Sequence, residues 1–385
     1  MVDDQLAQTS NTLFNIAFLT YLAATVAYFF RLAFTRVSVE GVPVGSAAGR
    51  RVGLAGTALA SCGAVVHLAS LVLRGMAVGR VPWANMFEYS SVLALGTVVV
   101  GLVVVQRKYG YGHLMGFVLA LAVLSMTSAL LLFTDPGPVV PALNSYWITI
   151  HTSAAMVASS IFIVAFGATA LYLVKDTAER RLAARSGNYA GSTVGAAYVE
   201  PATAESAVDE PPAADEPSEA KERPSPLAQR DTLSPVAFPV IPAVVVGAFT
   251  LIVWRAPVAT LSAASVAALL GIAAWYAVPY LPPAARLDAL AYRVNAFAFP
   301  IWTFAILAGA IWAQEAWGRY WGWDPKETGS FFTWVLYAGY LHARSTRGWR
   351  GRKAAWIGVA AFAALMITYY AVNLFVVGLH SYADV

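Results

Sequence analysis

The sequence predicts an all-α integral membrane protein: a polytopic bundle of about ten transmembrane helices with the N-terminus and the C-terminus outside. Hydrophobic residues make up 59% of the 385 residues and charged residues only 12%, a balance typical of chains that fold in lipid. Apolar runs of about 18 residues or more recur along the chain, and a helix needs this length to cross the hydrocarbon layer. The basic residues lie in short clusters between these runs, and their distribution predicts the orientation.

Ten apolar segments are candidate spans. They cover residues 13–30, 52–73, 87–105, 114–133, 148–174, 236–254, 258–281, 296–313, 331–341 and 354–377. The ninth segment has only eleven residues, but the sequence before it has the pattern of a helix start. Asp324 would be the N-cap, Pro325 the first helical residue and Glu327 the partner in a capping box. A helix over residues 325–344 would be about 30 Å long, so we expect it to span as well.

The charged residues predict which side each loop faces. Twenty of the 25 Lys and Arg residues fall on one set of alternating loops, and five fall on the other. Because cytoplasmic loops carry the excess of positive charge, the first set is predicted to be cytoplasmic. Both termini and the loop that precedes Asp324 are therefore expected on the outer face.

A polar stretch divides the apolar segments into two groups of five. Residues 176–235 are rich in Ala, Glu, Pro, Ser and Asp, a composition that buries too little apolar surface to offset its chain entropy. We expect a disordered cytoplasmic linker there, between an N-terminal membrane bundle over residues 1–175 and a C-terminal membrane bundle over residues 236–385. The second bundle carries a Trp-rich loop at residues 312–330.

Two features exclude whole classes of function. The single cysteine, Cys62, lies in an apolar run, so the chain has no disulfide framework and no zinc-site spacing. Any thiol chemistry must come from a thiol-reducing partner or from the substrate. The net charge of +4 is spread over short loops and forms no basic patch, so we expect no nucleic-acid partner.

The Trp-rich loop is the densest chemical signal in the chain. Residues 312–323 hold four Trp and one Tyr, with Gly318 and Gly322 between them. An aromatic belt at the membrane interface is the simplest explanation. A belt scatters its aromatic residues, however, whereas this cluster contains glycines that let a flat apolar ligand approach. Trp317, Tyr320, Trp321, Trp323 and Asp324 are therefore candidates for a ligand platform, and Arg319 and Lys326 for pairing with carboxylates on that ligand.

Two histidines are predicted at the depth of this outward loop. His151 begins the fifth span and His380 follows the tenth, so both are expected near the outer face. Two imidazoles that converge on one aromatic platform are what bis-His ligation of a haem iron requires. Taken singly, each histidine has a simpler interpretation as a hydrogen-bonded residue at the interface.

Two further histidines lie in apolar surroundings. His342 is near the inner end of the ninth helix, where an ionisable residue is a functional candidate. A hydrogen-bonded histidine at the cytoplasmic interface explains it equally well. His67 lies near the middle of the second span without any motif around it, so an interhelical hydrogen bond is the preferred interpretation.

These residues carry a resemblance to a known family. The sequence from Trp317 to Thr328, WGRYWGWDPKET, the closing GLHSYA that begins at Gly378 and the segment NSYWITIH that ends at His151 resemble the CcsA/ResC family of System II cytochrome c biogenesis proteins. The resemblance covers the chain from about Pro82 onward, with the linker excluded.

The resemblance implies a complete site and a set of partners. His151 and His380 would be the external axial ligands of haem b, with Asp324 within the platform, and His342 would serve a haem inside the membrane. The second ligand of that inner haem would belong to a ResB-type membrane subunit. The chain would be the haem-binding subunit of a holocytochrome c synthase in a bacterial cell membrane, with its active loop on the extracytoplasmic face.

The reaction implied by the resemblance is delivery of haem for attachment to the Cys-x-x-Cys-His segment of apocytochrome c. No Ser, Cys or Lys of this chain is placed as a nucleophile, so the substrate's own thiols would react. Two alternatives stay open. One is a System I haem handler that passes haem to a carrier protein. The other is a secondary transporter of an amphipathic anion, although no sequence repeat of the kind common in transporters is visible.

Overall fold

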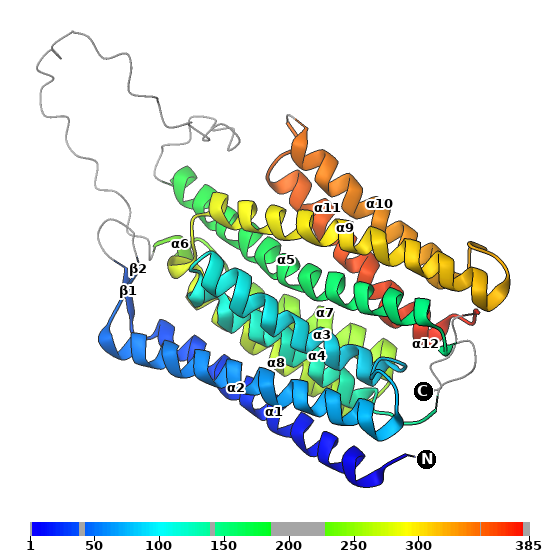
Figure 1. The fold of residues 1–385 in the computed structure, drawn as a ribbon. Helices are drawn as coiled ribbons and strands as arrows, with labels where there is room; N and C mark the ends of the chain where they lie inside the picture. Colours follow the sequence, from blue (N-terminus) through cyan, green and yellow to red (C-terminus); the bar gives the residue numbers. More distant parts are fainter. Residues whose placement is uncertain (1, 38–42, 139–142, 186–227, 347, 380–385) are drawn as a thin grey trace, which may run out of the picture.

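The computed structural model describes residues 2–37, 43–138, 143–185, 228–346 and 348–379, which form a bundle of long helices running side by side (Figure 1). The prediction of an all-α polytopic membrane protein is confirmed. In chain order the elements are α1 (Asp4–Leu32), β1 (Thr35–Val37), β2 (Pro43–Gly45), α2 (Ala47–Val78), α3 (Met86–Val100), η1 (Gly101–Lys108), η2 (Gly112–Leu114), α4 (Met115–Leu131), α5 (Tyr146–Arg185), α6 (Ala228–Asp231), α7 (Ala237–Trp254), α8 (Pro257–Ala277), η4 (Val278–Tyr280), α9 (Ala284–Trp317), α10 (Pro325–Ser345), α11 (Arg352–Met366), η5 (Ile367–Val372) and α12 (Asn373–Phe375).

The predicted spans all fall on helices. In the described part of the chain, eight helical segments are long and apolar enough to cross a membrane. The remaining two predicted spans are α7, which counts as a shorter apolar helix, and α10, whose first turn carries Lys326 and Glu327. The start of α10 is as predicted, since Asp324 is its N-cap, Pro325 lies in the first turn and the capping box with Glu327 forms.

One small element was not indicated by the hydropathy pattern. Strands β1 and β2 pair in antiparallel fashion between α1 and α2, with Thr35 opposite Gly45. Three residues per strand leave no room for an alternating pattern that a sequence window detects. The hairpin lies at the end of the bundle opposite the loop between α9 and α10 (Figure 1).

Helices α5 and α9 form the centre of the bundle. They pack along each other, and α5 also contacts α3, α4 and α11, whereas α1 packs on α2 and α7 on α8 (Figure 1). Aromatic rings fill the contact between α5 and its neighbours. Phe162 stacks on Tyr337 of α10 with ring centroids 3.7 Å apart, and Trp302 of α9 meets Phe162 edge-on. The 40 residues of α5 give it a length of about 60 Å, so it extends well past the hydrocarbon layer.

The C-terminal end of α5 enters the segment that was predicted as a linker. The helix continues to Arg185, and its Asp176 carboxylate accepts hydrogen bonds from Arg180, at 2.8 Å, and from Arg352 of α11, at 3.0 Å. Lys175 Nζ donates to Gln229 Oε1 at 2.6 Å, and this bond ties α6 to α5. Residues 186–227 of the linker lie outside the described residues, so its disorder and the division into two bundles stay predictions.

The opposite end of the bundle brings distant segments together. The start of α5, the loop between α9 and α10, and α12 all lie there (Figure 1). These are the segments that carry His151, the Trp-rich loop and the residues before His380. The fold therefore assembles most of the predicted site at one end.

Candidate functional site

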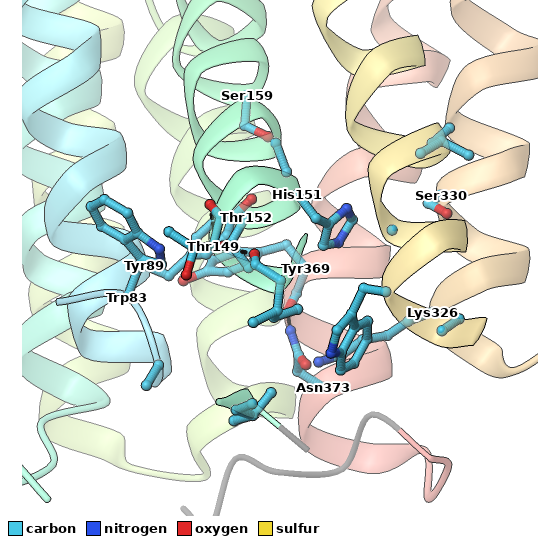
Figure 2. Close-up of a pocket in the computed structure, with 18 of the residues that line it drawn as sticks. Trp83, Tyr89, Thr149, His151, Thr152, Ser159, Lys326, Ser330, Tyr369 and Asn373 are labelled. Carbon is cyan, nitrogen blue, oxygen red and sulfur yellow. Dashed lines mark hydrogen bonds between the residues drawn. The ribbon is translucent and has the colours of Figure 1, made fainter. Parts of the chain in front are cut away.

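A cavity of about 470 Å³ lies at this end of the bundle, between α3, α5, α9, α10 and η5. Its wall follows α5 from Ile148 to Ser159, a depth of about 16 Å along the helix. His151 lies between these two residues, with Lys326 and Ser330 of α10 on one side of it and Trp83 and Tyr89 on the other (Figure 2). The volume is in the range of small-molecule and cofactor sites.

His151 is held in one orientation by a backbone hydrogen bond. Its Nδ1 lies 2.7 Å from the carbonyl oxygen of Ala305 in α9. A carbonyl oxygen only accepts, so Nδ1 carries the proton and Nε2 carries the lone pair. Metal-binding histidines commonly have this arrangement, in which the second ring nitrogen donates to a carbonyl or carboxylate. The structure thus presents His151 in the protonation state that an axial ligand needs.

A glycine that the sequence analysis missed makes this orientation possible. A Cβ atom at Gly309 of α9 would lie 2.7 Å from His151 Nδ1 and 2.8 Å from its Cε1. Real Cβ atoms do not approach so closely, so a larger residue at position 309 would displace the imidazole. The sequence signal was weak, because a glycine in a long apolar helix has many explanations.

The loop between α9 and α10 contains two residues with a left-handed backbone conformation. α9 ends at Gly318 with a φ of 69°, the left-handed C-cap that glycine favours. Trp323 has a φ of 58°, which is uncommon for a residue with a side chain. Such conformations persist only where the surroundings enforce them, and they cluster at functional sites.

Glu327 is the group that fixes the loop. One of its carboxylate oxygens, Oε2, accepts from the backbone N–H of Gly322 at 2.7 Å and of Asp324 at 3.1 Å. The other, Oε1, pairs with the Arg319 guanidinium at 3.2 Å. A Cβ at Gly322 would collide with that guanidinium, which gives this glycine a packing role as well.

Asp324 joins the loop to the end of the described chain. Its Oδ1 caps α10 through Lys326 N at 3.2 Å, and its Oδ2 accepts from the backbone N–H of Leu379 at 2.7 Å. Gly378 packs so closely on Asp324 and Pro325 that a Cβ there would lie 2.6 Å from Oδ2. His380 itself lies outside the described residues. The residue directly before it is therefore anchored to the Trp-rich loop.

The structure brings some predicted site residues to the cavity and leaves others aside. His151, Tyr320, Trp321 and Lys326 line it. Trp317, Arg319, Trp323 and Asp324 are not among the lining residues. Trp317 packs against Trp312 with centroids 4.8 Å apart, Trp323 is exposed and meets Trp321 edge-on, and Arg319 is engaged with Glu327.

His342 and His67 occupy different environments. His342 is exposed on α10, 16 residues after Lys326 and therefore about 24 Å from it along the helix. His67 of α2 is buried, and its Nε2 lies 2.8 Å from Ser91 Oγ of α3. The predicted interhelical hydrogen bond of His67 is confirmed.

Sequence reasoning also missed the connection between α2 and α3 as a wall of the cavity. Arg80, Trp83, Asn85 and Tyr89 all line it. The charge analysis had used Arg74 and Arg80 only as markers of an outward loop. The signal available was that Glu88 follows Arg74 and Arg80 closely in the sequence and begins an apolar helix. Whether Glu88 pairs with these arginines, however, depends on the turn between α2 and α3.

Comparisons with known proteins agree with this geometry. A family model described as "Cytochrome C assembly protein" matches residues 83–380. The chain is similar to "Cytochrome c biogenesis protein CcsA" from Rippkaea orientalis, with 31% identity over 386 residues that cover 97% of each protein. It is 30% identical to the protein of the same name from Gloeobacter violaceus, over 98% of this chain and 97% of that protein. A CcsA protein from Microcystis aeruginosa is 54% identical over 99 residues, which are 26% of this chain and 30% of that protein.

Proposed function

This chain belongs to the cytochrome c assembly protein family, and we propose that it holds haem at the outer face of a bacterial cell membrane for attachment to apocytochrome c. It would act as the haem-binding subunit of a System II holocytochrome c synthase. The observation that carries the proposal is His151, which lines the cavity with its Nδ1 committed to the Ala305 carbonyl and its Nε2 left to bind iron.

The cavity fits a haem b through its donors as well as its size. His151 supplies one axial ligand, and His380 is proposed as the second. The hydrogen bond from Leu379 to Asp324 supports this pairing, because His380 follows Leu379 directly and consecutive Cα atoms are about 3.8 Å apart. Asp324 would then act as a positioning residue for the second ligand while it caps α10.

Aromatic residues of the loop would hold the ring plane. Trp321 and Tyr320 line the cavity, and Tyr320 is exposed at its mouth. Trp317 supports the platform from behind through Trp312, and exposed Trp323 is placed to meet a protein that approaches from outside. For the haem carboxylates, Lys326 lines the cavity, whereas Arg319 would act by holding the loop together through Glu327.

The chain contributes binding and orientation, and the substrate contributes the nucleophiles. The thiols of a Cys-x-x-Cys-His segment on apocytochrome c would add to the haem vinyl groups, after a thiol-reducing partner has kept them reduced. His151 and His380 would hold the haem, and the cavity walls would orient it for that attack. The only cysteine, Cys62, is on α2 and does not line the cavity.

The inner site is proposed at His342, together with a ResB-type partner subunit. His342 is exposed on α10, so a second ligand has to approach it from outside the described chain. A partner helix packed on α10 would supply that ligand and cover the apolar side chains beside it. The exposure of Phe332 and Val335 on the same helix supports a covered face.

The proposed orientation has ten spans, both termini outside and residues 186–227 in the cytoplasm. Charge on the alternating loops supports it. The common position of the α5 start, the Trp-rich loop and α12 at one end of the bundle agrees with it (Figure 1).

Absorption spectroscopy of the purified full-length chain, expressed with its partner subunit, tests the proposed function. We expect a low-spin haem spectrum. Its external component should be lost when His151 and His380 are both replaced by alanine, and cytochrome c maturation should be lost with it. Replacing His67, a histidine that is already hydrogen-bonded to Ser91, with glutamine is the matched control and should preserve both. Protein that carries no haem, or a double variant that still matures cytochrome c, would contradict the proposal.

A further inference from the structure

The cavity wall formed by the connection between α2 and α3 contains a donor that no described residue satisfies. Among the described residues, Trp83 Nε1 is a buried nitrogen with no hydrogen-bond acceptor. Trp83 lines the cavity and lies on its α3 side (Figure 2). Buried N–H groups without a partner are rare in native proteins because they lose their water without gaining a protein acceptor.

The position of Trp83 is set by a buried ion network. Glu88, which is 0% exposed, accepts from Arg74 Nε at 2.8 Å, from Arg80 at 2.8 Å and from the backbone N–H of Ala84 at 2.8 Å. Asn85 caps α3 by accepting from Glu88 N at 2.8 Å. Because the residues on both sides of Trp83 are held in this way, its indole has little freedom to turn toward another acceptor.

The same wall carries positive charge. The Arg80 guanidinium lines the cavity, and its N–H groups are already bonded to Glu88 and to the carbonyl oxygens of Val81 and Gly137. Arg74 adds a second guanidinium behind it, against the single buried carboxylate of Glu88. Asp135 faces this cluster, but its side chain is exposed and screened by solvent. An anion at this wall would therefore meet a favourable field and one free N–H donor.

We propose that Trp83 donates its indole N–H to a carboxylate of the bound haem and so determines which edge of the haem faces the α2–α3 connection. This inference rests on the proposed function and deepens it. Arg80 contributes charge, Trp83 contributes the hydrogen bond, and the buried Glu88 network is the device that positions both. The acidic edge of the macrocycle then lies toward α3.

A second tryptophan of the same cavity provides a matched control. Trp302 of α9 also lines the cavity, but its Nε1 already donates to the Ser330 carbonyl at 3.4 Å. Substituting phenylalanine removes an N–H from either position and keeps an aromatic ring. Only the Trp83→Phe variant removes a donor that is unpaired in the protein.

Titration of the full-length protein, in complex with its partner and depleted of haem, with haem and with haem dimethyl ester tests the proposal. The ester keeps the iron and the ring but has no charged carboxylate. The wild-type protein should prefer haem over the ester by more than about tenfold in Kd. Trp83→Phe should reduce this preference by about tenfold while the contribution of Lys326 remains, and Trp302→Phe should leave the preference unchanged. The bis-His absorption spectrum, recorded in each titration, shows that the site is intact.

Two results would overturn the proposal. A wild-type protein that binds haem and its ester equally well refutes it without any variant, so a poorly folding Trp83→Phe protein does not leave it untested. A Trp83→Phe variant that weakens haem and ester binding by the same factor shows that Trp83 only packs, with water as its acceptor. A wild-type protein that binds neither haem nor its ester would instead refute the proposed function itself.

Discussion

The environments of His151 and His342 are opposite in almost every physical respect. His151 lines a cavity between helices, and its Nδ1 is fixed by the Ala305 carbonyl at 2.7 Å. His342 is exposed near the C-terminal end of α10, about 24 Å along that helix from Lys326, and does not line the described cavity. Under the proposed function, the His151 site would be built almost entirely by this chain, whereas the His342 site would need a ligand from a partner subunit.

Removal of the His151 imidazole should produce the largest effect of any single substitution. We expect His151→Ala to lower haem occupancy of the external site by more than about tenfold, since even groups that only orient a metal ligand change affinity by about 10–100-fold. Comparing the pyridine haemochrome content of His342→Ala with that of the double variant His151→Ala, His342→Ala measures the loss at the external site. An unchanged haem content would show that the cavity is not the haem site.

The corresponding change at the inner end should be more easily reversed. His342→Ala leaves an opening at an exposed position, which free imidazole can reach. Haem content should fall in this variant and recover in part when imidazole is added during growth. The external low-spin spectrum should persist, because His151 and its cavity are untouched. Failure of imidazole to restore any haem would contradict a ligand role for His342.

Gly309 offers a test of the orientation of His151 without removing the ligand. The Cβ atom of Gly309→Ala would collide with the imidazole, at a cost of about 1–3 kcal/mol in haem binding or protein stability. Gly339→Ala in α10 is the matched control, because a Cβ there meets nothing within 4 Å. Isothermal haem titration of both variants should show weakened binding for position 309 alone. Equal behaviour of the two would separate His151 from haem binding.

The smallest expected effects on stability and haem affinity come from the two basic residues of the loop, Arg319 and Lys326, and they differ between the two. Arg319 pairs with Glu327 while partly exposed, so Arg319→Gln should cost less than about 1 kcal/mol of stability and leave haem affinity unchanged. Lys326 lines the cavity, so Lys326→Gln should weaken haem binding by about tenfold through loss of a charged contact. Thermal unfolding and haem titration measure the two quantities. A larger affinity loss for Arg319→Gln would reverse the assignment.

The sequence predicted the features that depend on local pattern. Each of the ten segments that hydropathy located falls on a helix, and the Asp324-Pro325-Glu327 pattern predicted the capping box at the start of α10. Clustering of aromatic residues identified the loop, and Trp321 and Tyr320 from that cluster line the cavity. Such signals need only neighbouring residues, so a single sequence contains them.

The features that the sequence did not reveal depend on contacts between distant segments. Gly309 matters because α9 packs against the His151 side chain of α5, which lies more than 150 residues earlier in the chain. Trp83 and Glu88 matter because the turn between α2 and α3 folds against α5 and the loop after α4. No periodicity encodes such a meeting. The hydrogen bond from the Leu379 backbone N–H to the Asp324 carboxylate was missed for the same reason, since Asp324 was assigned only as a helix cap and as a candidate platform residue.

A haem-bound structure of the chain with its partner subunit would test the central claim most directly. The proposed function predicts that the iron of the external haem is bound by His151 Nε2, with Nδ1 still donating to the Ala305 carbonyl and the ring beside Trp321. A haem that occupies another part of the bundle, with His151 Nε2 bound to no metal, would contradict it.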